Sequence, residues 1–207
     1  MSPMCALDKA ALAGVVSRYA DAVIPTDYGR MRVVVYHEAG TPHEHCAIIH
    51  GDVQSKEHVL IRVHSECFTG EVLHSLKCDC REQLDYALRA IAKEDAGIVI
   101  YLRQEGRGIG LGNKIRAYAL QDERGADTVD ANRLLGFADD LRRYHVATCI
   151  LAELDITSVR LLTNNPLKVD ALRAEGLEVE RVPMQIEPGE QNEGYISTKR
   201  TRMGHLP

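Results

Sequence analysis

Aromatic residues are scarce in this sequence of 207 residues, which has no tryptophan and only two phenylalanines. Proteins that bind single-stranded nucleic acid stack bases on aromatic side chains and line the groove with basic ones. Positive charge is also in deficit, because the formal net charge is −5 and the sequence pI is near 6.0. Both shortages argue against a nucleic-acid-binding protein. A site for an anion would have to be built locally.

Long hydrophobic runs are absent as well. None approaches the length of a membrane span, and Asp8, Lys9 and Arg18 interrupt the N-terminal segment where a secretory signal would be apolar. We therefore expect a cytoplasmic protein that does not associate with a membrane. In a reducing compartment, clustered cysteines are more often metal ligands than disulfides.

The length fits one large domain or two small ones, the hydrophobic content of 45% is ordinary for a globular protein, and no internal repeat appears. We expect residues 1–207 to form a single domain. Apolar residues at helical spacing over residues 6–20 predict a helical extension within residues 1–23. The segment 189–207 is polar and is expected to be a loosely packed tail.

Two kinds of pattern follow one another along the chain. Short runs rich in Val and Ile, separated by turn residues, predict strands at 31–36, 46–49 and 59–63 in an antiparallel sheet after a turn-rich hinge at 24–29. Strand–loop–helix units are then expected, with strands at 97–102 and 159–162 and helices at 84–97, from 113, at 139–154 and at 165–176. The sequence therefore predicts an α+β fold with a mixed β-sheet, whose N-terminal half is antiparallel.

Polar residues follow both predicted buried strands, starting at Gln104 and at Thr163. Ligands of open α/β sheets bind at the carboxyl ends of strands, so we expect a ligand site there. After the second strand, Asn165 can cap a helix that has Pro166 at its first position and ends at Gly176.

Three of the six cysteines are close together, Cys67, Cys78 and Cys80. Their C-x10-C-x-C spacing supplies three thiolates, which are preferred zinc ligands, and catalytic zinc sites typically leave a fourth position to water or substrate. We favour such an open site. A closed structural site completed by His64 or His74 is the alternative.

A basic glycine-rich segment runs from Arg103 to Arg116, with four basic side chains against the single acid Glu105. Glycine occupies every second position from 106 to 112, so backbone N–H groups can approach an anion closely. The pattern matches neither the dinucleotide-binding nor the Walker fingerprint. It predicts a polyphosphate clamp of another kind, and a flexible loop with a solvated basic face is the alternative.

Several longer blocks occur in a characteristic order: RVHSEC, KCDC, EQL, QEGRGIGL, NKIRAYALQ, DTVDAN, LGF, LLTNNP, KV and MGHL. From about Ile24 to Leu206 the sequence resembles GTP cyclohydrolase II. The resemblance implies a zinc-dependent hydrolase that opens the imidazole ring of GTP in the first step of riboflavin biosynthesis. Formate and pyrophosphate would be released, leaving 2,5-diamino-6-(5-phosphoribosylamino)pyrimidin-4(3H)-one. It also implies one Zn²⁺ per subunit, Mg²⁺ with the triphosphate, and a homodimer.

The resemblance further implies site residues. Zinc would be held by the three clustered cysteines. GTP would be contacted by Arg62, Val63, His64, Ser65, Glu66, Gln83, Glu105, Gly106, Arg107, Thr128, Thr163 and Lys168. Asp140 would be the general base, Arg142 the group that attacks the α-phosphorus, and Tyr118 a further catalytic residue. Because a guanidinium is effectively never deprotonated, Arg142 is physically a poor nucleophile and a good electrostatic clamp for phosphoryl oxygens, and the sequence leaves both roles open.

Two residues depart from the family pattern. Arg81 stands where glycine is usual, and Gly112 where leucine is common. If position 81 needs a positive φ, Arg81 costs on the order of 1 kcal/mol. Otherwise Arg81 adds positive charge near the metal. A non-catalytic nucleotide-binding module with a closed structural zinc is the main competing interpretation.

Overall fold

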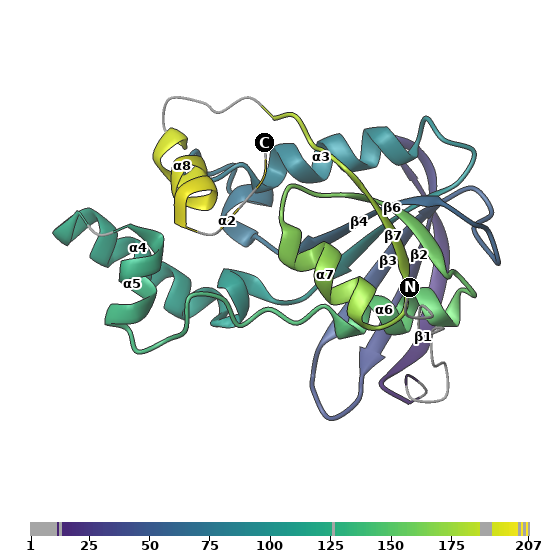
Figure 1. The fold of residues 1–207 in the computed structure, drawn as a ribbon, viewed down its shortest axis with the longest axis horizontal. Coiled ribbons are helices and arrows are strands. Elements are labelled where there is room, and N and C mark those ends of the chain that lie inside the picture. Colours follow the sequence, from purple (N-terminus) through teal and green to yellow (C-terminus); the bar gives the residue numbers. More distant parts are fainter. Residues whose placement is uncertain are drawn as a thin grey trace, which may run out of the picture. The chain divides into compact units, whose positions relative to one another are not determined.

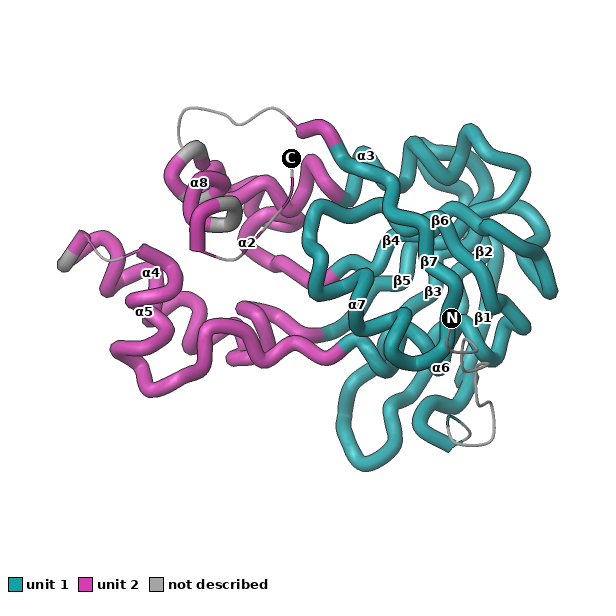
Figure 2. Tube along the Cα trace, viewed as in Figure 1, with its two compact units in different colours: residues 1–64, 84–103, 144–184 teal, residues 65–83, 104–143, 185–207 magenta. Residues whose placement is uncertain are grey.

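The computed structural model describes residues 12, 14–125, 127–186, 192–202, 204 and 206. The chain divides into two compact units, and each unit is assembled from three separate segments (Figure 2). Unit 1 comprises residues 1–64, 84–103 and 144–184, and unit 2 comprises residues 65–83, 104–143 and 185–207. The assignment of all 207 residues to one domain stays a prediction.

A seven-stranded mixed sheet forms the frame of unit 1, in the order β1-β2-β3-β5-β4-β6-β7 (Figure 1). The strands are β1 (Val16–Thr26), β2 (Gly29–Glu38), β3 (Glu44–His50), β4 (Val59–Ser65), β5 (Gly97–Leu102), β6 (Ser158–Leu162) and β7 (Glu178–Val182). β1, β2, β3 and β5 pair antiparallel, whereas β4, β6 and β7 pair parallel. The predicted α+β class with a mixed sheet is confirmed.

Burial along the strands follows their place in the sheet. β4 and β5 are buried at nearly every position, as expected for central strands covered on both faces, and β3 alternates between buried and partly exposed residues. The helices of this unit are α3 (Cys80–Ile91), α6 (His145–Glu153) and α7 (Pro166–Ala174). α6 is almost wholly buried and contacts β1, β5 and α7, which places it in the core.

The start of α7 forms as the sequence predicts. The side chain of Asn165 accepts a hydrogen bond from the backbone N–H of Leu167 at 3.0 Å, and Pro166 occupies the first turn. Gly176 has a φ of +92° just beyond the helix. The cap fixes the polar loop at the carboxyl end of β6.

The described part of unit 2 is mainly helical. It contains α2 (Phe68–Glu71), the first turn of α3, the 3₁₀ turn η1 (Glu105–Gly108), α4 (Gly110–Arg124), α5 (Thr128–Leu134) and α8 (Glu193–Arg202). Asp127 caps α5 by accepting from the N–H groups of Val129 and Asp130 at 2.8 and 2.9 Å. Across both units, the described residues include no helix long and apolar enough to cross a lipid bilayer.

Several sequence predictions about the two ends of the chain were wrong. Residues 16–20 belong to β1 and not to a helix, while residues 1–11 and 13 lie outside the described part. The expected hinge at 24–29 comprises the end of β1, the two-residue turn at 27–28 and the first residue of β2. β1 is an exposed edge strand, so tertiary burial imposes no clear alternation on its residues.

At the other end, the tail expected to be loosely packed contains α8. Arg202 on this helix donates to Asp127 and, at 3.0 Å, to Asp130. Position 203 and residues 187–191 are outside the described part. Arg202 is therefore ion-paired with acidic groups at the start of α5.

Two further expectations were wrong in detail. The run at 59–63 becomes β4, which pairs parallel with β6 and so leaves the antiparallel half. The helix expected from Asp139 begins at His145 instead. Alternating apolar runs do not show which partner a strand will find, because the pairing depends on distant segments.

Candidate metal centre

The end of β4 and the start of α3 bring the three clustered cysteines together within unit 2. Cys67 directly precedes α2, Cys78 lies in the following loop, and Cys80 is the first residue of α3. Their Sγ atoms all lie within 4.8 Å of one another, and those of Cys67 and Cys78 are 3.6 Å apart. Zn–S bonds of about 2.3 Å in a tetrahedron would place sulfurs about 3.8 Å apart. The donor set and its spacing fit a zinc ion.

A glycine makes this close approach possible. A Cβ atom at Gly70 would lie 3.0 Å from the Sγ of Cys78 and 3.2 Å from that of Cys67. Contacts this short require the sulfurs or α2 to move by a few tenths of an ångström. A side chain at position 70 would therefore disturb the spacing of the three sulfurs.

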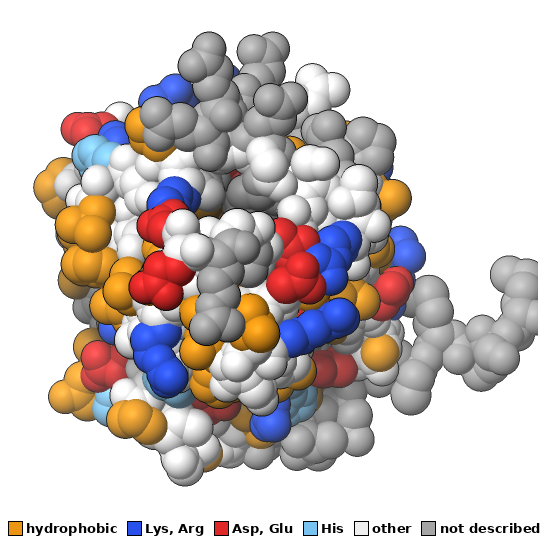
Figure 3. All heavy atoms as spheres, turned by 90° about the vertical axis from the view of Figure 1, so that its left-hand side faces the viewer, with side chains coloured by type: hydrophobic (Ala, Val, Ile, Leu, Met, Phe, Trp, Pro, Cys, Tyr) orange, Lys and Arg blue, Asp and Glu red, His pale blue; other side chains and the backbone are white. Residues whose placement is uncertain are grey.

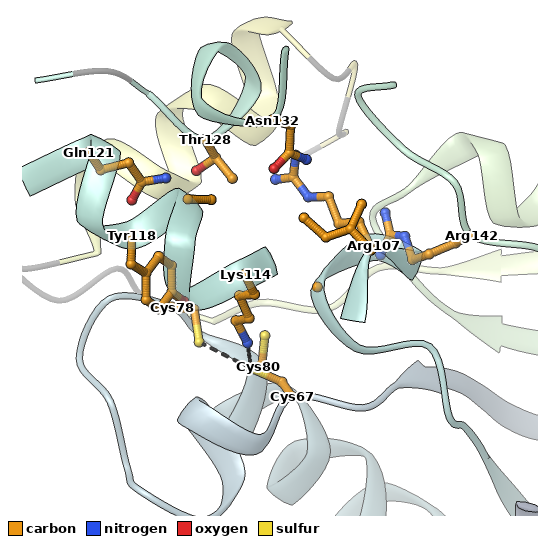
Figure 4. A pocket seen from close by; sticks show the side chains of 13 residues that line it. Cys67, Cys78, Cys80, Arg107, Lys114, Tyr118, Gln121, Thr128, Asn132 and Arg142 are labelled. Atoms are coloured by element: carbon orange, nitrogen blue, oxygen red, sulfur yellow. Dashed lines mark hydrogen bonds between the residues drawn. The ribbon is translucent and has the colours of Figure 1, made fainter. Parts of the chain in front are cut away.

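Lys114 of α4 reaches the same sulfurs (Figure 4). Its Nζ donates to the Sγ of Cys67 at 3.1 Å and to Oε1 of Glu105 at 2.7 Å. Both charged side chains are buried, with 9% of Lys114 and 8% of Glu105 exposed. The Glu105 carboxylate also accepts from the N–H groups of Phe68 at 2.6 Å and Gly106 at 2.7 Å. The carboxylate is thus fully engaged in holding the lysine and two loops.

The electrostatics of the cluster concentrate negative charge on one sulfur. Hydrogen bonds from Cys78 and Cys80, assisted by the Lys114 ammonium, hold the pKa of Cys67 well below its usual range. The same sulfur of Cys67 raises the pKa of Cys78 to about 11 and that of Cys80 well above its ordinary value. Burial disfavours the charge of Lys114, but Glu105 and Cys67 outweigh it and raise its pKa.

A cavity of about 80 Å³ opens beside the sulfurs, and all of its lining belongs to unit 2. Figure 4 shows Tyr118 near the sulfurs, with Arg107 and Arg142 together on another side of the cavity. The lining residues are Cys67, Cys78, Cys80, Gly106, Arg107, Ile109, Lys114, Ala117, Tyr118, Gln121, Thr128, Asn132 and Arg142. Three thiols that could hold a metal and several cationic side chains therefore face the same small space.

The glycine-rich segment is a packed left-handed turn. Arg107 has a φ of +61° between Gly106 at +62° and Gly108 at +90°. A Cβ at position 108 would lie 3.1 Å from the Cβ of Leu141, and the Arg107 carbonyl accepts from the Leu141 N–H at 3.0 Å. A left-handed non-glycine residue costs on the order of 1 kcal/mol, so the fold holds Arg107 against a local preference. This packing favours a fixed arginine over a free basic loop.

Asp140 and Arg142 lie in the irregular segment before α6 and form a close pair. The Asp140 carboxylate accepts from the backbone N–H of Arg142 at 3.0 Å and from its Nε at 2.9 Å. Burial opposes the charge of Asp140, but Arg142 outweighs it and lowers the pKa of the carboxyl. Asp140 is therefore ionised at neutral pH. Arg142 lines the cavity, whereas Asp140 is not among its lining residues.

Other residues predicted to contact GTP belong to unit 1, at the carboxyl ends of β4 and β6. Arg62 is buried and donates through Nη1 to the Leu162 carbonyl at 2.9 Å. Lys168 of α7 is also buried and donates to the Val63 carbonyl at 2.7 Å. These bonds bring the predicted residues of the two parallel strands together.

Thr163 and His64 complete that group in unit 1. The Thr163 hydroxyl accepts from the Asn165 N–H at 3.0 Å, just before α7. The His64 ring stacks on Tyr101 with 5.7 Å between centroids. The metal-ligand group found among the described residues consists of Cys67, Cys78 and Cys80, and the choice between an open and a closed site stays a prediction.

The remaining predicted contacts lie in unit 2. Ser65 accepts from the Gln104 amide at 2.9 Å, and Gln83 donates to Asp79 at 2.6 Å in the first turn of α3. Glu66 is partly exposed. Arg81 lies in α3 and is not among the described residues with positive φ, so its substitution for glycine carries no backbone strain.

Sequence reasoning missed the roles of Lys114, Gln121 and Asn132 at the cavity. The sequence places Lys114 in the basic segment and so predicts a phosphate contact. Its contact with Cys67, a residue distant in sequence, leaves no signal in the local pattern. Gln121 follows Lys114 and Tyr118 at helical spacing along α4, a periodicity that could have grouped them.

These observations define a class, a mixed-sheet α+β protein in which three cysteines and a cationic cavity meet. A family model for GTP cyclohydrolase II matches residues 17–183, and the chain belongs to this family. It is 52% identical over 192 residues to the GTP cyclohydrolase-2 of Hahella chejuensis, covering 92% of each chain. It is 46% identical over 192 residues to the riboflavin biosynthesis protein RibBA of Endomicrobium trichonymphae, covering 92% of this chain and 47% of the relative.

The chain thus spans about half the length of the RibBA relatives and nearly the whole length of other relatives. The crystal structure of RibBX, a two-domain 3,4-dihydroxy-2-butanone 4-phosphate synthase from A. baumannii, is similar in fold, with a TM-score of 0.50 and 19% identity. The alignment covers 86% of this chain and 43% of RibBX. At that identity the likeness concerns the fold alone.

Proposed function

We propose that the protein hydrolyses GTP, opening the imidazole ring with release of C8 as formate and of pyrophosphate. The product is 2,5-diamino-6-(5-phosphoribosylamino)pyrimidin-4(3H)-one, the first intermediate of riboflavin biosynthesis. Family membership supports the reaction class. The observation that carries the proposal is the set of three sulfurs within 4.8 Å of one another, facing a cavity that Arg107 and Arg142 also line.

Cys67, Cys78 and Cys80 would hold Zn²⁺, which supplies Lewis-acid assistance to hydrolysis at C8 of the purine when bound. The Tyr118 hydroxyl is proposed to orient the attacking water, because Tyr118 lines the cavity beside the three sulfurs. Its ring centroid lies 5.2 Å from the Nζ of Lys77 and 5.8 Å from the Nζ of Lys114. These contacts fix the ring against the metal-binding segment.

Arg107 and Arg142 are proposed to bind the phosphates, and the ionised Asp140 to accept a proton once substrate competes for Arg142. A clamp fits this geometry better than a nucleophile, because the Arg142 guanidinium is fully protonated and paired with a carboxylate. Mg²⁺ would accompany the triphosphate. The other predicted GTP contacts, including Arg62, Thr163 and Lys168, are retained in the proposal.

We also propose a cytoplasmic homodimer, following the family. A nucleic-acid partner is not favoured. Among the described side chains on the face drawn in Figure 3, acidic and basic groups lie interspersed with apolar ones, without a broad area of positive charge.

The proposal is tested by incubating the purified protein with GTP, Zn²⁺ and Mg²⁺ and measuring formate and pyrophosphate separately. Stoichiometric formate is expected, and mass spectrometry should detect the deformylated pyrimidine. A protein that binds GTP tightly but releases no formate would be a nucleotide-binding module with a structural metal. Release of pyrophosphate without formate would show that the protein hydrolyses the triphosphate but does not open the imidazole ring.

The role of the cysteine cluster is tested with Cys78→Ser, and Cys46→Ser is the matched control. Cys46 lies in β3, outside the metal-ligand group, and both changes replace a thiol by a hydroxyl. Loss of formate release only in Cys78→Ser is expected. Equal activity in the two variants would contradict a role for the cysteine cluster.

A further inference from the structure

Lys114 occupies an unusual position for a lysine in a basic, glycine-rich segment. It is buried, and its ammonium points at the metal-binding sulfurs in Figure 4. Two of its N–H groups are engaged, one by the Cys67 Sγ at 3.1 Å and one by the Glu105 carboxylate at 2.7 Å. A side chain held in this way cannot also follow a mobile phosphate tail.

The charge of the centre explains why a cation is useful there. Three thiolates around Zn²⁺ leave a formal charge of about −1, which weakens the metal as a Lewis acid and is costly to bury. An ammonium in hydrogen-bond contact with one thiolate offsets that charge. It also withdraws electron density from the sulfur, so the metal keeps more of its positive character.

Glu105 determines where the ammonium lies. Backbone N–H groups from Phe68 and Gly106 fix its carboxylate, so the oxygen that accepts from Lys114 has little freedom. Phe68 directly follows Cys67, and Gly106 belongs to the glycine-rich turn. The carboxylate therefore couples the position of Lys114 to the same backbone that presents the cysteine.

We propose that Lys114, anchored by Glu105, is a positioning residue that tunes the metal centre through Cys67 and is not a phosphate ligand. The inference rests on the metal centre of the proposed function. The basic segment then has two separate functions. Arg107 faces the cavity that would hold the substrate, whereas Lys114 donates a hydrogen bond to the sulfur of Cys67.

The test compares Lys114→Met, Lys114→Arg and the double variant Glu105→Gln/Lys114→Met. The double variant is included because methionine alone leaves a buried carboxylate without its cation and can unfold the protein. Circular dichroism and thermal unfolding establish that each variant is folded. Lys93→Met is the matched control, because Lys93 is an exposed lysine of unit 1 in the turn after α3, outside the metal centre and the cavity.

Two readouts require no turnover. Zinc affinity is measured by competition with a chromophoric chelator, and the sulfur-to-metal charge-transfer band is recorded after Co²⁺ substitution. The double variant is expected to bind zinc about 10- to 100-fold more weakly at neutral pH, because the thiolates lose a hydrogen-bond donor. Its band should move to longer wavelength, since an unbonded thiolate is the better electron donor. Lys114→Arg should lie between wild type and the double variant, and Lys93→Met should match wild type.

The outcomes separate this inference from the proposed function. If the wild-type protein binds neither Zn²⁺ nor Co²⁺, the metal centre itself is refuted and both fail. If the wild type binds metal and the double variant shows the same affinity and the same band, the tuning role is refuted while the enzyme assignment stands. Unchanged metal properties together with a raised KM for GTP in a folded Lys114→Met or Lys114→Arg variant, in which Glu105 is intact, would return Lys114 to phosphate binding.

Discussion

The two units are stabilised by different means. The main apolar cluster, which joins strands β2 to β7 with α6 and α7, lies entirely in unit 1. Unit 1 also buries charged groups such as Arg62 and Lys168, but it does so beside this large cluster, whereas the described part of unit 2 has few buried apolar side chains beside Glu105 and Lys114. Apolar burial contributes about 25 cal/mol per Å² without directional demands, whereas buried polar groups contribute only when every partner is in place. We infer that unit 1 is the more stable frame and that unit 2 depends more strongly on the proposed metal.

The largest expected effect tests that contrast by removing the metal. Chelation or Cys78→Ser should abolish formate release and lower the hydrogen-exchange protection of α2 and α4, while the amides of β4 to β6 stay protected. Exchange measured by mass spectrometry distinguishes the units. Equal loss of protection in the sheet would show that both units unfold together, and the contrast would be wrong.

Next in size is the loss of Arg142. Arg142→Ala should slow pyrophosphate release by about 10²- to 10³-fold, as expected when one charge-stabilising donor is removed, and Arg142→Lys should retain part of the rate. Arg143→Ala is the control, because Arg143 is the next residue in the sequence and its side chain is exposed. An unchanged rate in Arg142→Ala would remove this residue from the phosphate site.

A smaller and more selective effect is expected for Tyr118→Phe. Loss of a hydroxyl that assists proton transfer should slow formate release by about 10²-fold and pyrophosphate release much less. Single-turnover measurement of both products gives the comparison, with the partly exposed Tyr86→Phe of α3 as control. Parallel slowing of both products would contradict a role at the ring.

The smallest effects come from two glycines of unit 2. Gly70→Ala should destabilise the protein by about 1–3 kcal/mol and weaken metal binding, because its Cβ overpacks the sulfurs. Gly112→Ala should stabilise it by up to about 1 kcal/mol, since position 112 is helical and has open space around a Cβ. Thermal unfolding with and without chelator measures both. A Gly70→Ala protein as stable as wild type would show that α2 can shift freely.

The same contrast explains what the sequence could predict. The burial of β4 and β5 in unit 1 is recognisable from their largely apolar sequences. The start of α7 is specified locally by Asn165 and Pro166. The three cysteines are likewise recognisable because they are near one another in sequence. Each of these signals lies within a short window.

The parts that escaped prediction depend on contacts between distant segments. Lys114 meets Cys67 only after α4 and α2 have folded, and Arg202 becomes ordered through Asp127 and Asp130. β1 gains its conformation from hydrogen bonding along β2 and not from any apolar period of its own. Periodicity contains no information about such partners.

The split of unit 2 into separate segments has a consequence for biosynthesis. The first segment carries all three cysteines, and the second, with Lys114, leaves the ribosome only after α3 and β5 have been made. A divalent ion bound by the three cysteines during that interval would form an anionic complex with no ammonium beside it. The arrangement of Lys114 beside the sulfurs is complete only when the later segment arrives.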